Sequence, residues 1–223
     1  MSNQRRDLRR KTFVWVLSVC FFSSLLFHAA VAMNCQDLKR AGIIPDVLPE
    51  SACRALSVEV GIQFASGSPT KGSRMALHAV TDCPTITLSQ RPEQGQKAVV
   101  FLTDPDAPSR LVHLPSTSEL RRVVRFRANP VAGEWAHWVA SAEDKTIQSG
   151  SKTFLPYAPP TPPKGTGPHR YVALVYFGST SKLTGVPSPA NRRQWGGPRH
   201  AHAVASESGL ALVGVNWFTV EHK

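Results

Sequence analysis

One strand and the turn after it constrain the fold of this 223-residue chain more than any other feature. The residues AVVFLT, at 98–103, are apolar almost throughout, which predicts a strand buried within a sheet. The sequence DPDAPSR follows directly, and its prolines, Pro105 and Pro108, cannot continue a central strand. Asp104 is therefore expected at the end of a buried strand, where the sheet meets a loop.

Short strands separated by turns are predicted along the rest of the chain. The 18 prolines and 15 glycines favour frequent turns over long helices. Apolar runs and alternation predict strands at 57–64, 85–88, 133–142, 146–150, 169–177 and 211–220. Short helices are predicted near 35–41 and 201–208, and SGSPTKGSR at 66–74 is predicted to be a turn. These elements indicate a mainly β domain.

Strict alternation predicts which side chains share a face of a strand. In EWAHWV, it places Trp135 and His137 on one face and Ala136 and Trp138 on the other. In the strand at 169–177, the odd-numbered residues share one face and the even-numbered residues share the opposite face.

The first 32 residues differ from the rest of the chain. Positive charge is concentrated at 5–11, residues 12–27 are mostly apolar, and the small residues AVA at 30–32 offer a cleavage site. This pattern is typical of a secretory signal peptide. A retained signal anchor is the alternative, because the apolar stretch at 12–32 is just long enough to span a bilayer. In both cases the folded part, 33–223, is expected in the secretory pathway or outside the cell.

The balance of charge favours anionic partners. The leader holds 5 of the 26 Lys and Arg residues and 1 of the 15 acidic residues, which leaves 21 against 14, or +7, for the remainder. Such a balance attracts phosphate, carboxylate or an acidic membrane surface. A nucleic-acid partner is not expected, since the sequence has no groove-reading or basic-aromatic motif.

Three cysteines remain once Cys20 of the leader is set aside. An exported chain permits disulfides, and Cys35 and Cys53 flank a short segment before the first predicted strand, so this pair is favoured and Cys83 is left as a thiol. The sequence contains no CxxC motif and no Cys/His spacing of a metal site. Neither a metal nor a cofactor is therefore expected.

Polar side chains recur at or near the ends of otherwise apolar strands. Asp104 ends one strand, His137 lies in EWAHWV, and His169 and Tyr171 begin the strand HRYVALVYF. A carboxylate, two imidazoles and a phenol would suit a small anion-binding pocket, because imidazole and phenol donate hydrogen bonds to oxyanions. A neighbouring Asp104 would raise the pKa values of the histidines and hold them charged.

Each of these side chains also has a purely structural interpretation. Asp104 suits an Asp-Pro turn, and His137, between two tryptophans, suits a hydrogen-bonded core position. The sequence alone does not show that the strand ends converge. No GxSxG or HExxH motif is present, so nucleophilic catalysis has no support, whereas acid–base catalysis by Asp104, His137 and His169 is left open.

Taken together, the motifs resemble those of a known family. DPDAPSR (104–110), EWAHWV (134–139) and PPKGTGPHRYVALVY (162–176) are similar, in this order, to motifs of the phosphatidylethanolamine-binding protein family. The resemblance extends from about Ile43 to the C-terminal NWFTVEH, and the leader is similar to that of secreted fungal members. It implies a mainly β, β-sandwich-like fold with a large antiparallel sheet, a smaller sheet and a few short helices.

The resemblance also implies the residues of a ligand pocket. Carried over by their positions in the matching motifs, they are Asp104, Trp135, His137, Pro162, His169 and Tyr171. Such pockets accept phosphate, acetate or a phosphoethanolamine headgroup, so an anionic small molecule is the implied ligand.

Two features depart from the family pattern. Residues 111–133 form a basic insertion with four arginines, where relatives have a much shorter connection. Its arginines would lie near the mouth of the pocket, unless the segment is an artefact of the gene model. Ala136 stands where relatives often carry a larger His or Arg.

Three functions follow as hypotheses. The first is an exported module that binds an anionic headgroup or metabolite in this pocket. The second, implied by fungal relatives, is an enzyme or accessory protein of secondary-metabolite biosynthesis that assists the dimerisation or cyclisation of maleic-anhydride polyketide units, with Asp104, His137 and His169 as catalytic residues. The third, also implied by fungal relatives, is inhibition of a serine carboxypeptidase, which gives a possible protease partner.

Overall fold

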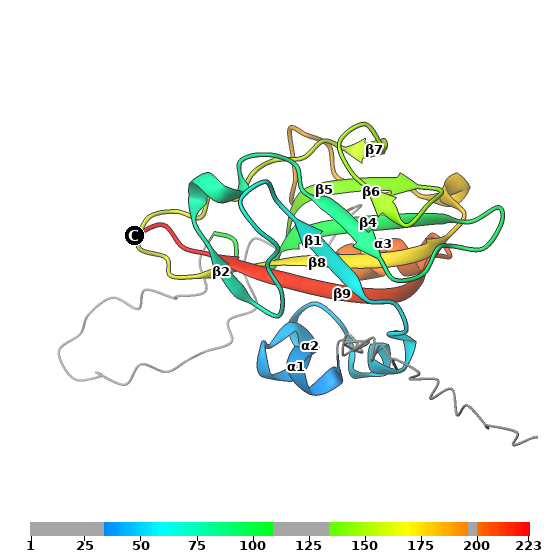
Figure 1. Ribbon diagram of the computed structural model, residues 1–223, viewed down its shortest axis with the longest axis horizontal. Helices are drawn as coiled ribbons and strands as arrows, with labels where there is room; N and C mark the ends of the chain where they lie inside the picture. Colours follow the sequence, from blue (N-terminus) through cyan, green and yellow to red (C-terminus); the bar gives the residue numbers. More distant parts are fainter. Residues whose placement is uncertain (1–33, 109–133, 196–199) are drawn as a thin grey trace, which may run out of the picture.

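The computed structural model describes residues 34–108, 134–195 and 200–223. Within these ranges a six-stranded sheet and a three-stranded sheet pack against each other, and short helices cover the other face of the large sheet (Figure 1). The predicted leader and the predicted basic insertion at 111–133 lie outside the described residues. The mainly β architecture with two sheets and a few short helices confirms the predicted fold class.

The large sheet positions the candidate site. Its strand order is β2 (Ser73–Met75), β9 (Ala211–Val220), β8 (His169–Gly178), β4 (Lys97–Asp104), β5 (Trp135–Ala142) and β7 (Lys152–Leu155). All neighbours are antiparallel except β2 and β9, which run parallel. The small sheet is antiparallel and consists of β1 (Val60–Gln63), β3 (Thr85–Leu88) and β6 (Thr146–Ile147).

The helices are short and lie mostly at the N-terminal end. They are α1 (Cys35–Arg40), α2 (Ile43–Asp46) and α3 (Ala201–Glu207), with 3-10 turns η1 (Glu50–Ala55), η2 (Leu77–Val80) and η3 (Thr180–Lys182). Among the described residues, no helix is long and apolar enough to cross a membrane.

Two apolar cores lie on the two faces of the large sheet. On β8, Val172 and Leu174 belong to the core beneath the helices, whereas Ala173 and Val175 belong to the core between the sheets. A strand that is covered on both faces needs apolar residues at every position, which explains the near-continuous apolar runs of β4 and β8. We call these regions the helix-side core and the inter-sheet core.

Several strands differ in detail from the sequence predictions. The predicted turn at 66–74 ends in a strand, β2, because its backbone pairs with the exposed edge of β9. β7 was not predicted, since its residues have no clear apolar alternation. The first predicted strand begins three residues later than expected, because the amides of Ser57 and Val58 donate to Val213 of β9 before β1 pairs with β3.

A bulge in β5 overturns the predicted alternation of EWAHWV. The register with β4 shifts so that Leu102 pairs with Trp138 and Thr103 pairs with Ala136, which leaves His137 as the extra residue. Ala136 consequently lies in the helix-side core and Trp138 in the inter-sheet core, although they are two residues apart. The bulge turns His137 and Trp138 to the same side of the sheet.

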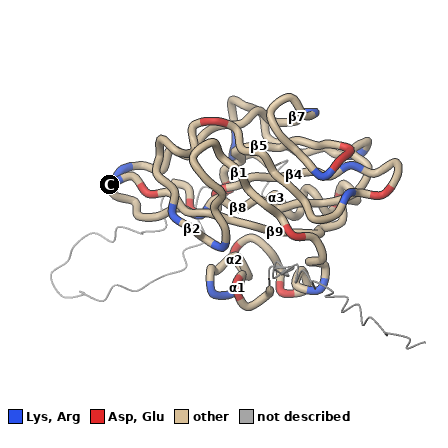
Figure 2. The backbone as a smooth tube through the Cα atoms, viewed as in Figure 1, with Lys and Arg blue, Asp and Glu red and all other residues tan. Residues whose placement is uncertain are grey.

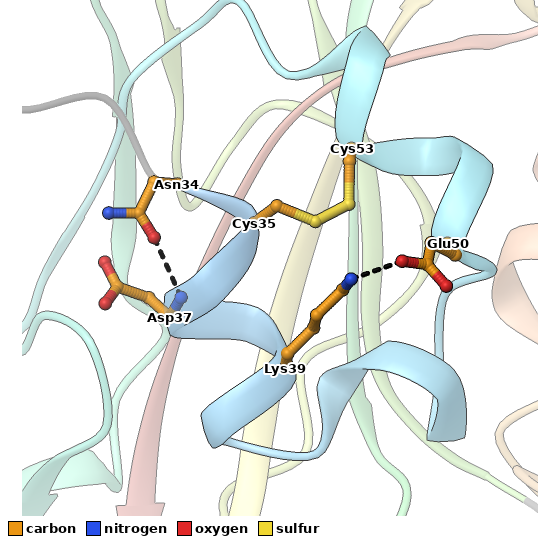
Figure 3. The surroundings of a disulfide bond; sticks show 6 residues. All are labelled: Asn34, Cys35, Asp37, Lys39, Glu50 and Cys53. Atoms are coloured by element: carbon orange, nitrogen blue, oxygen red, sulfur yellow. Dashed lines mark hydrogen bonds and ion pairs between the residues drawn. A yellow bond between two sulfur atoms is a disulfide. The ribbon is translucent and has the colours of Figure 1, made fainter.

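The favoured disulfide is confirmed. Cys35 of α1 and Cys53 of η1 are bonded, with 5.3 Å between their Cα atoms (Figure 3). Asn34 caps α1 by accepting a hydrogen bond from the amide of Asp37, and Lys39 pairs with Glu50 beside the disulfide. Cys83 is a free, half-buried thiol, and burial raises its pKa to about 11.

Candidate functional site

Three neighbouring strands bring the predicted site residues to one end of the large sheet. Asp104 ends β4, His169 and Tyr171 begin the adjacent antiparallel strand β8, and His137 lies in β5 on the other side of β4. The convergence that the sequence could not establish follows from this antiparallel register, since the end of β4 pairs with the beginning of both neighbours.

Asp104 and His169 form a buried pair at the centre of the site. The Nδ1 atom of His169 lies 2.8 Å from Oδ2 of Asp104, and its Nε2 atom lies 3.0 Å from the hydroxyl of Thr166. The other carboxylate oxygen of Asp104 accepts a hydrogen bond from the amide of Asp106 at 2.7 Å. His169 is fully buried and Asp104 is 3% exposed, so both side chains are held in one orientation.

His137 is neutral, which corrects the expectation that Asp104 holds both histidines charged. Burial lowers the pKa of His137 to about 4, and this effect outweighs the opposing field of Asp104. The ring Nδ1 lies 2.7 Å from the carbonyl oxygen of Ala158, and a neutral imidazole must donate its proton there. Its Nε2 atom therefore carries a lone pair and acts as an acceptor.

Tyr171 brings an unsatisfied donor into the site. Its ring stacks on Phe218 at 5.3 Å and meets the edge of His137 at 5.0 Å between ring centroids. Its hydroxyl is buried and has no hydrogen-bond partner among the described residues. Burial raises the pKa of Tyr171, and the carboxylates of Asp104 and Asp106 raise it further, so the hydroxyl remains protonated and able to donate.

Trp135 and Pro162 complete the set of predicted site residues. Trp135 is half-buried, with its ring centroid 6.3 Å from that of His137, and Pro162 is buried in the loop that precedes β8. The guanidinium of Arg193 lies 4.7 Å from the centroid of the Trp135 ring, a cation–π distance. Arg193 thus adds a positive charge beside Trp135 that the sequence analysis did not anticipate.

A buried ion pair of Asp106 and Arg170 lies two residues further along DPDAPSR and one residue further along β8, and the sequence analysis missed it. Arg170 donates from Nε and Nη2 to the two carboxylate oxygens of Asp106, at 2.9 and 2.7 Å. Its Nη2 also lies 3.0 Å from Asp46, and its Nη1 donates to the carbonyl of Ala41 at 2.9 Å. The available signal was the position of Arg170 on the face opposite His169, together with a second Asp in DPD.

Glu134 is another buried acid that sequence reasoning did not single out. It is 1% exposed, its Oε2 accepts a hydrogen bond from the amide of Ala201 at 2.7 Å, and its Oε1 has no partner among the described residues. Burial raises the pKa of Glu134 to about 7, with a smaller contribution from Asp104. The signal was a lone acidic residue directly before an apolar strand.

Within the described ranges, no three His, Cys, Asp or Glu side chains are arranged to hold a metal ion. The site itself offers one hydrogen-bond donor from Tyr171, one acceptor from His137, and the Asp104–His169 pair.

Fold and site together define a class: a two-sheet β protein with a closed polar site at the ends of its central strands. The protein-family model described as phosphatidylethanolamine-binding protein matches residues 60–213. The chain belongs to the phosphatidylethanolamine-binding protein family, as its motifs implied.

Similarity to individual relatives extends over more than four fifths of the chain. A putative phosphatidylethanolamine-binding protein of Plasmodium falciparum is 29% identical over 200 residues, which cover 83% of this chain and 96% of that protein. The carboxypeptidase Y inhibitor of Saccharomyces cerevisiae is 28% identical over 212 residues, 83% of this chain and 93% of that protein. The solved phosphatidylethanolamine-binding protein from Plasmodium vivax superimposes with a TM-score of 0.71 at 27% identity, covering 86% of this chain and 99% of that one.

Proposed function

We propose that the site formed by Asp104, His137, His169 and Tyr171 binds a small anionic group, phosphate or carboxylate. The buried, unpartnered hydroxyl of Tyr171 is the observation that carries the proposal. A buried donor without a partner costs about 1–3 kcal/mol, and a ligand oxygen would remove that cost. Trp135 and Pro162 would form the apolar walls around the ligand.

The neutral state of His137 defines how the anion is held. Because its Nδ1 donates to Ala158, its Nε2 faces the ligand as an acceptor. A fully ionised carboxylate would be repelled by that lone pair, whereas a ligand that carries its own proton, such as a singly protonated phosphate monoester, would be accepted. To bind an ionised carboxylate, His137 must first take up a proton, so binding of a carboxylate should strengthen as the pH falls.

Calorimetric titration tests the proposal with O-phosphoethanolamine and acetate between pH 5.5 and 7.5. Tyr171→Phe should weaken binding at least about tenfold, because it removes one hydrogen bond to a charged group. Tyr176→Phe is the matched control, since its phenol lies on the same strand but in the helix-side core, bonded to His202. Equal affinity of wild type and Tyr171→Phe for both ligands would refute the proposal.

A protease partner is a second candidate, favoured by the similarity to the yeast carboxypeptidase Y inhibitor. Inhibition would depend on surface contacts rather than on the buried site. Carboxypeptidase Y activity measured with increasing amounts of the protein distinguishes the two candidates, because an inhibitor that uses its surface should be unaffected by Tyr171→Phe.

An enzymatic role in metabolite biosynthesis is the alternative that the neutral imidazole favours. The lone pair of His137 could remove a proton from a maleic-anhydride polyketide unit, while the Asp104–His169 pair holds a donor in place. Product formation from such units, lost in a His137→Gln variant that still folds, would distinguish catalysis from binding alone.

We also propose that the folded part, 33–223, is a single domain of the secretory pathway, with residues 1–32 as its leader. The Cys35–Cys53 disulfide supports this assignment, because disulfides form and persist in oxidising compartments. A leader retained as an anchor is the alternative that the sequence left open.

A further inference from the structure

A groove of about 430 Å³ lies on the helix-side face of the large sheet, away from the Asp104 site. Its walls come from α1, from the turn before β2 and from the end of β9, with Arg40, Lys71 and Trp217 among the lining residues. Figure 2 marks basic positions in α1 and beside β2. The volume falls within the range typical of small-molecule sites.

Two cations at the rim retain free hydrogen-bonding capacity. Nζ of Lys71 lies 3.2 Å from Oδ2 of Asp37, and Nη1 of Arg40 lies 3.6 Å from Oδ1 of the same residue. The side chains of Lys71 and Arg40 are 42% and 69% exposed, so both cations are accessible from solvent. Arg170 also lines the groove, but Asp106 and Asp46 balance its charge. The rim thus carries two cations against one carboxylate.

Trp217 adds a hydrogen-bond donor to the lining of the groove. Its side chain is mostly buried, with the residue 4% exposed, and its indole Nε1 donates to none of the described residues. A Cβ at Gly72 would lie 2.6 Å from this nitrogen, so only glycine allows the turn to approach the indole edge so closely. An indole N–H in the wall of a groove can donate a hydrogen bond to a ligand there.

The turn that carries Lys71 is held in a costly conformation. Lys71 has a φ of +49°, a region that non-glycine residues rarely adopt, and Gly72 follows with a φ of +85°. Backbone amides pin both residues: Lys71 donates to the side chain of Asn216 at 3.1 Å and Gly72 to the carbonyl of Trp217 at 2.9 Å.

The opposite wall is also fixed. The Cys35–Cys53 disulfide and the Lys39–Glu50 pair tie α1 to η1, as Figure 3 shows. Because both walls are held in place, the separation of the backbone segments that carry Arg40 and Lys71 is set by the fold.

We propose that this groove is a second oxyanion site, which takes a carboxylate or a phosphate with a short apolar body. Arg40 and Lys71 provide charge-assisted hydrogen bonds, and Trp217 provides its indole N–H and an apolar edge. The site is independent of the Asp104 site, because Trp217 belongs to the helix-side core whereas Tyr171 and Phe218 belong to the inter-sheet core.

The experiment follows tryptophan indole ¹⁵N–¹H resonances of the full chain during titration with inorganic phosphate and, separately, with benzoate. Trp217→Phe assigns the resonance of the groove, Trp135 reports on the Asp104 site, and Trp195, which donates to the carbonyl of Glu134 at 2.9 Å, is an internal reference. The Trp217 resonance should shift and saturate with either probe, in the wild type and in Tyr171→Phe alike.

Two double variants isolate the rim cations. Arg40→Gln with Lys71→Gln should weaken the binding seen at Trp217 at least about tenfold. Arg54→Gln with Lys182→Gln removes the same charge from exposed positions outside the groove and should change it less than about twofold. An unmoved Trp217 resonance, or equal weakening by both double variants, would overturn the proposal. A shift of the Trp135 resonance alone would locate anion binding at the Asp104 site only and would overturn this proposal. A shift of the Trp217 resonance with no shift of Trp135 would support the groove and contradict anion binding at the Asp104 site.

Discussion

Two buried side-chain pairs, made by nearby residues of the same two motifs, differ in almost every property. Asp104 and Asp106 both come from DPDAPSR, and their partners His169 and Arg170 are consecutive residues of β8. His169 has two ring contacts, to Asp104 and Thr166, and lies in the site where Tyr171 has an unpartnered hydroxyl. The guanidinium of Arg170 contacts two carboxylates and a backbone carbonyl.

The difference shows how a strand separates stability from chemistry. Successive side chains on β8 point to opposite faces, so His169 faces the inter-sheet side and Arg170 faces the helix side. Arg170 joins the sheet to the segment of α1 and α2 through Ala41 and Asp46. A guanidinium is always charged, and its fork fits a carboxylate, whereas an imidazole changes charge near neutral pH. The Asp106–Arg170 pair therefore suits a permanent link, and the Asp104–His169 pair suits a ligand site.

Glutamine placed at position 170 in one variant and at position 169 in another tests this difference between the two pairs. Arg170→Gln should lower the free energy of unfolding by roughly 3–5 kcal/mol, because it removes the buried guanidinium that bonds both carboxylate oxygens of Asp106. Urea denaturation at pH 7 measures this loss. A loss below about 1 kcal/mol, the scale of an ordinary hydrogen bond, would show that the pair is not a structural link.

The second prediction concerns Glu134 and His137, whose effects on stability oppose each other as the pH changes. Glu134 has a folded pKa of about 7, above its ordinary value, so its ionisation destabilises the fold as the pH rises from about 4.5 to 7. His137 has a folded pKa of about 4, below its ordinary value, so its protonation destabilises the fold as the pH falls from about 6.5 to 4. The two slopes should nearly cancel in the wild type.

In the Glu134→Gln variant, the pH dependence of the free energy of unfolding should be the one that His137 causes. The free energy of unfolding of this variant should rise by about 3 kcal/mol between pH 4 and 6.5, while that of the wild type stays flatter. Urea denaturation at intervals of pH measures both curves, and His137→Gln is the reciprocal control with the opposite slope. Parallel curves for wild type and Glu134→Gln would contradict the raised pKa of Glu134.

The smallest effect on stability is expected at His169. His169→Gln retains an N–H that can donate to Asp104, so the free energy of unfolding should fall by only about 1 kcal/mol. Its affinity for O-phosphoethanolamine should nevertheless fall, because the ring no longer connects Asp104 with Thr166. If this variant were as unstable as Arg170→Gln, the division between a structural pair and a ligand pair would be wrong.

Much of the fold and of the site could be predicted from local sequence. The apolar runs located β4, β8 and β9, the prolines after Asp104 ended β4, and the motif order indicated the family. The bulge at His137 could not be predicted, because it arises from the register between β4 and β5. β2 was missed for the same reason, since a three-residue edge strand exists only through its pairing with β9.

The sequence by itself determined which residue types stand at the strand ends: Asp104, His169 and Tyr171 follow from periodicity and from the turn chemistry of proline. Only the tertiary structure decided what they do there. The neutral state of His137, the raised pKa of Glu134 and the unpartnered hydroxyl of Tyr171 all depend on burial by segments that are distant in sequence. Periodicity is a local property of the chain, whereas desolvation and hydrogen-bond partners depend on which remote segments fold against each residue.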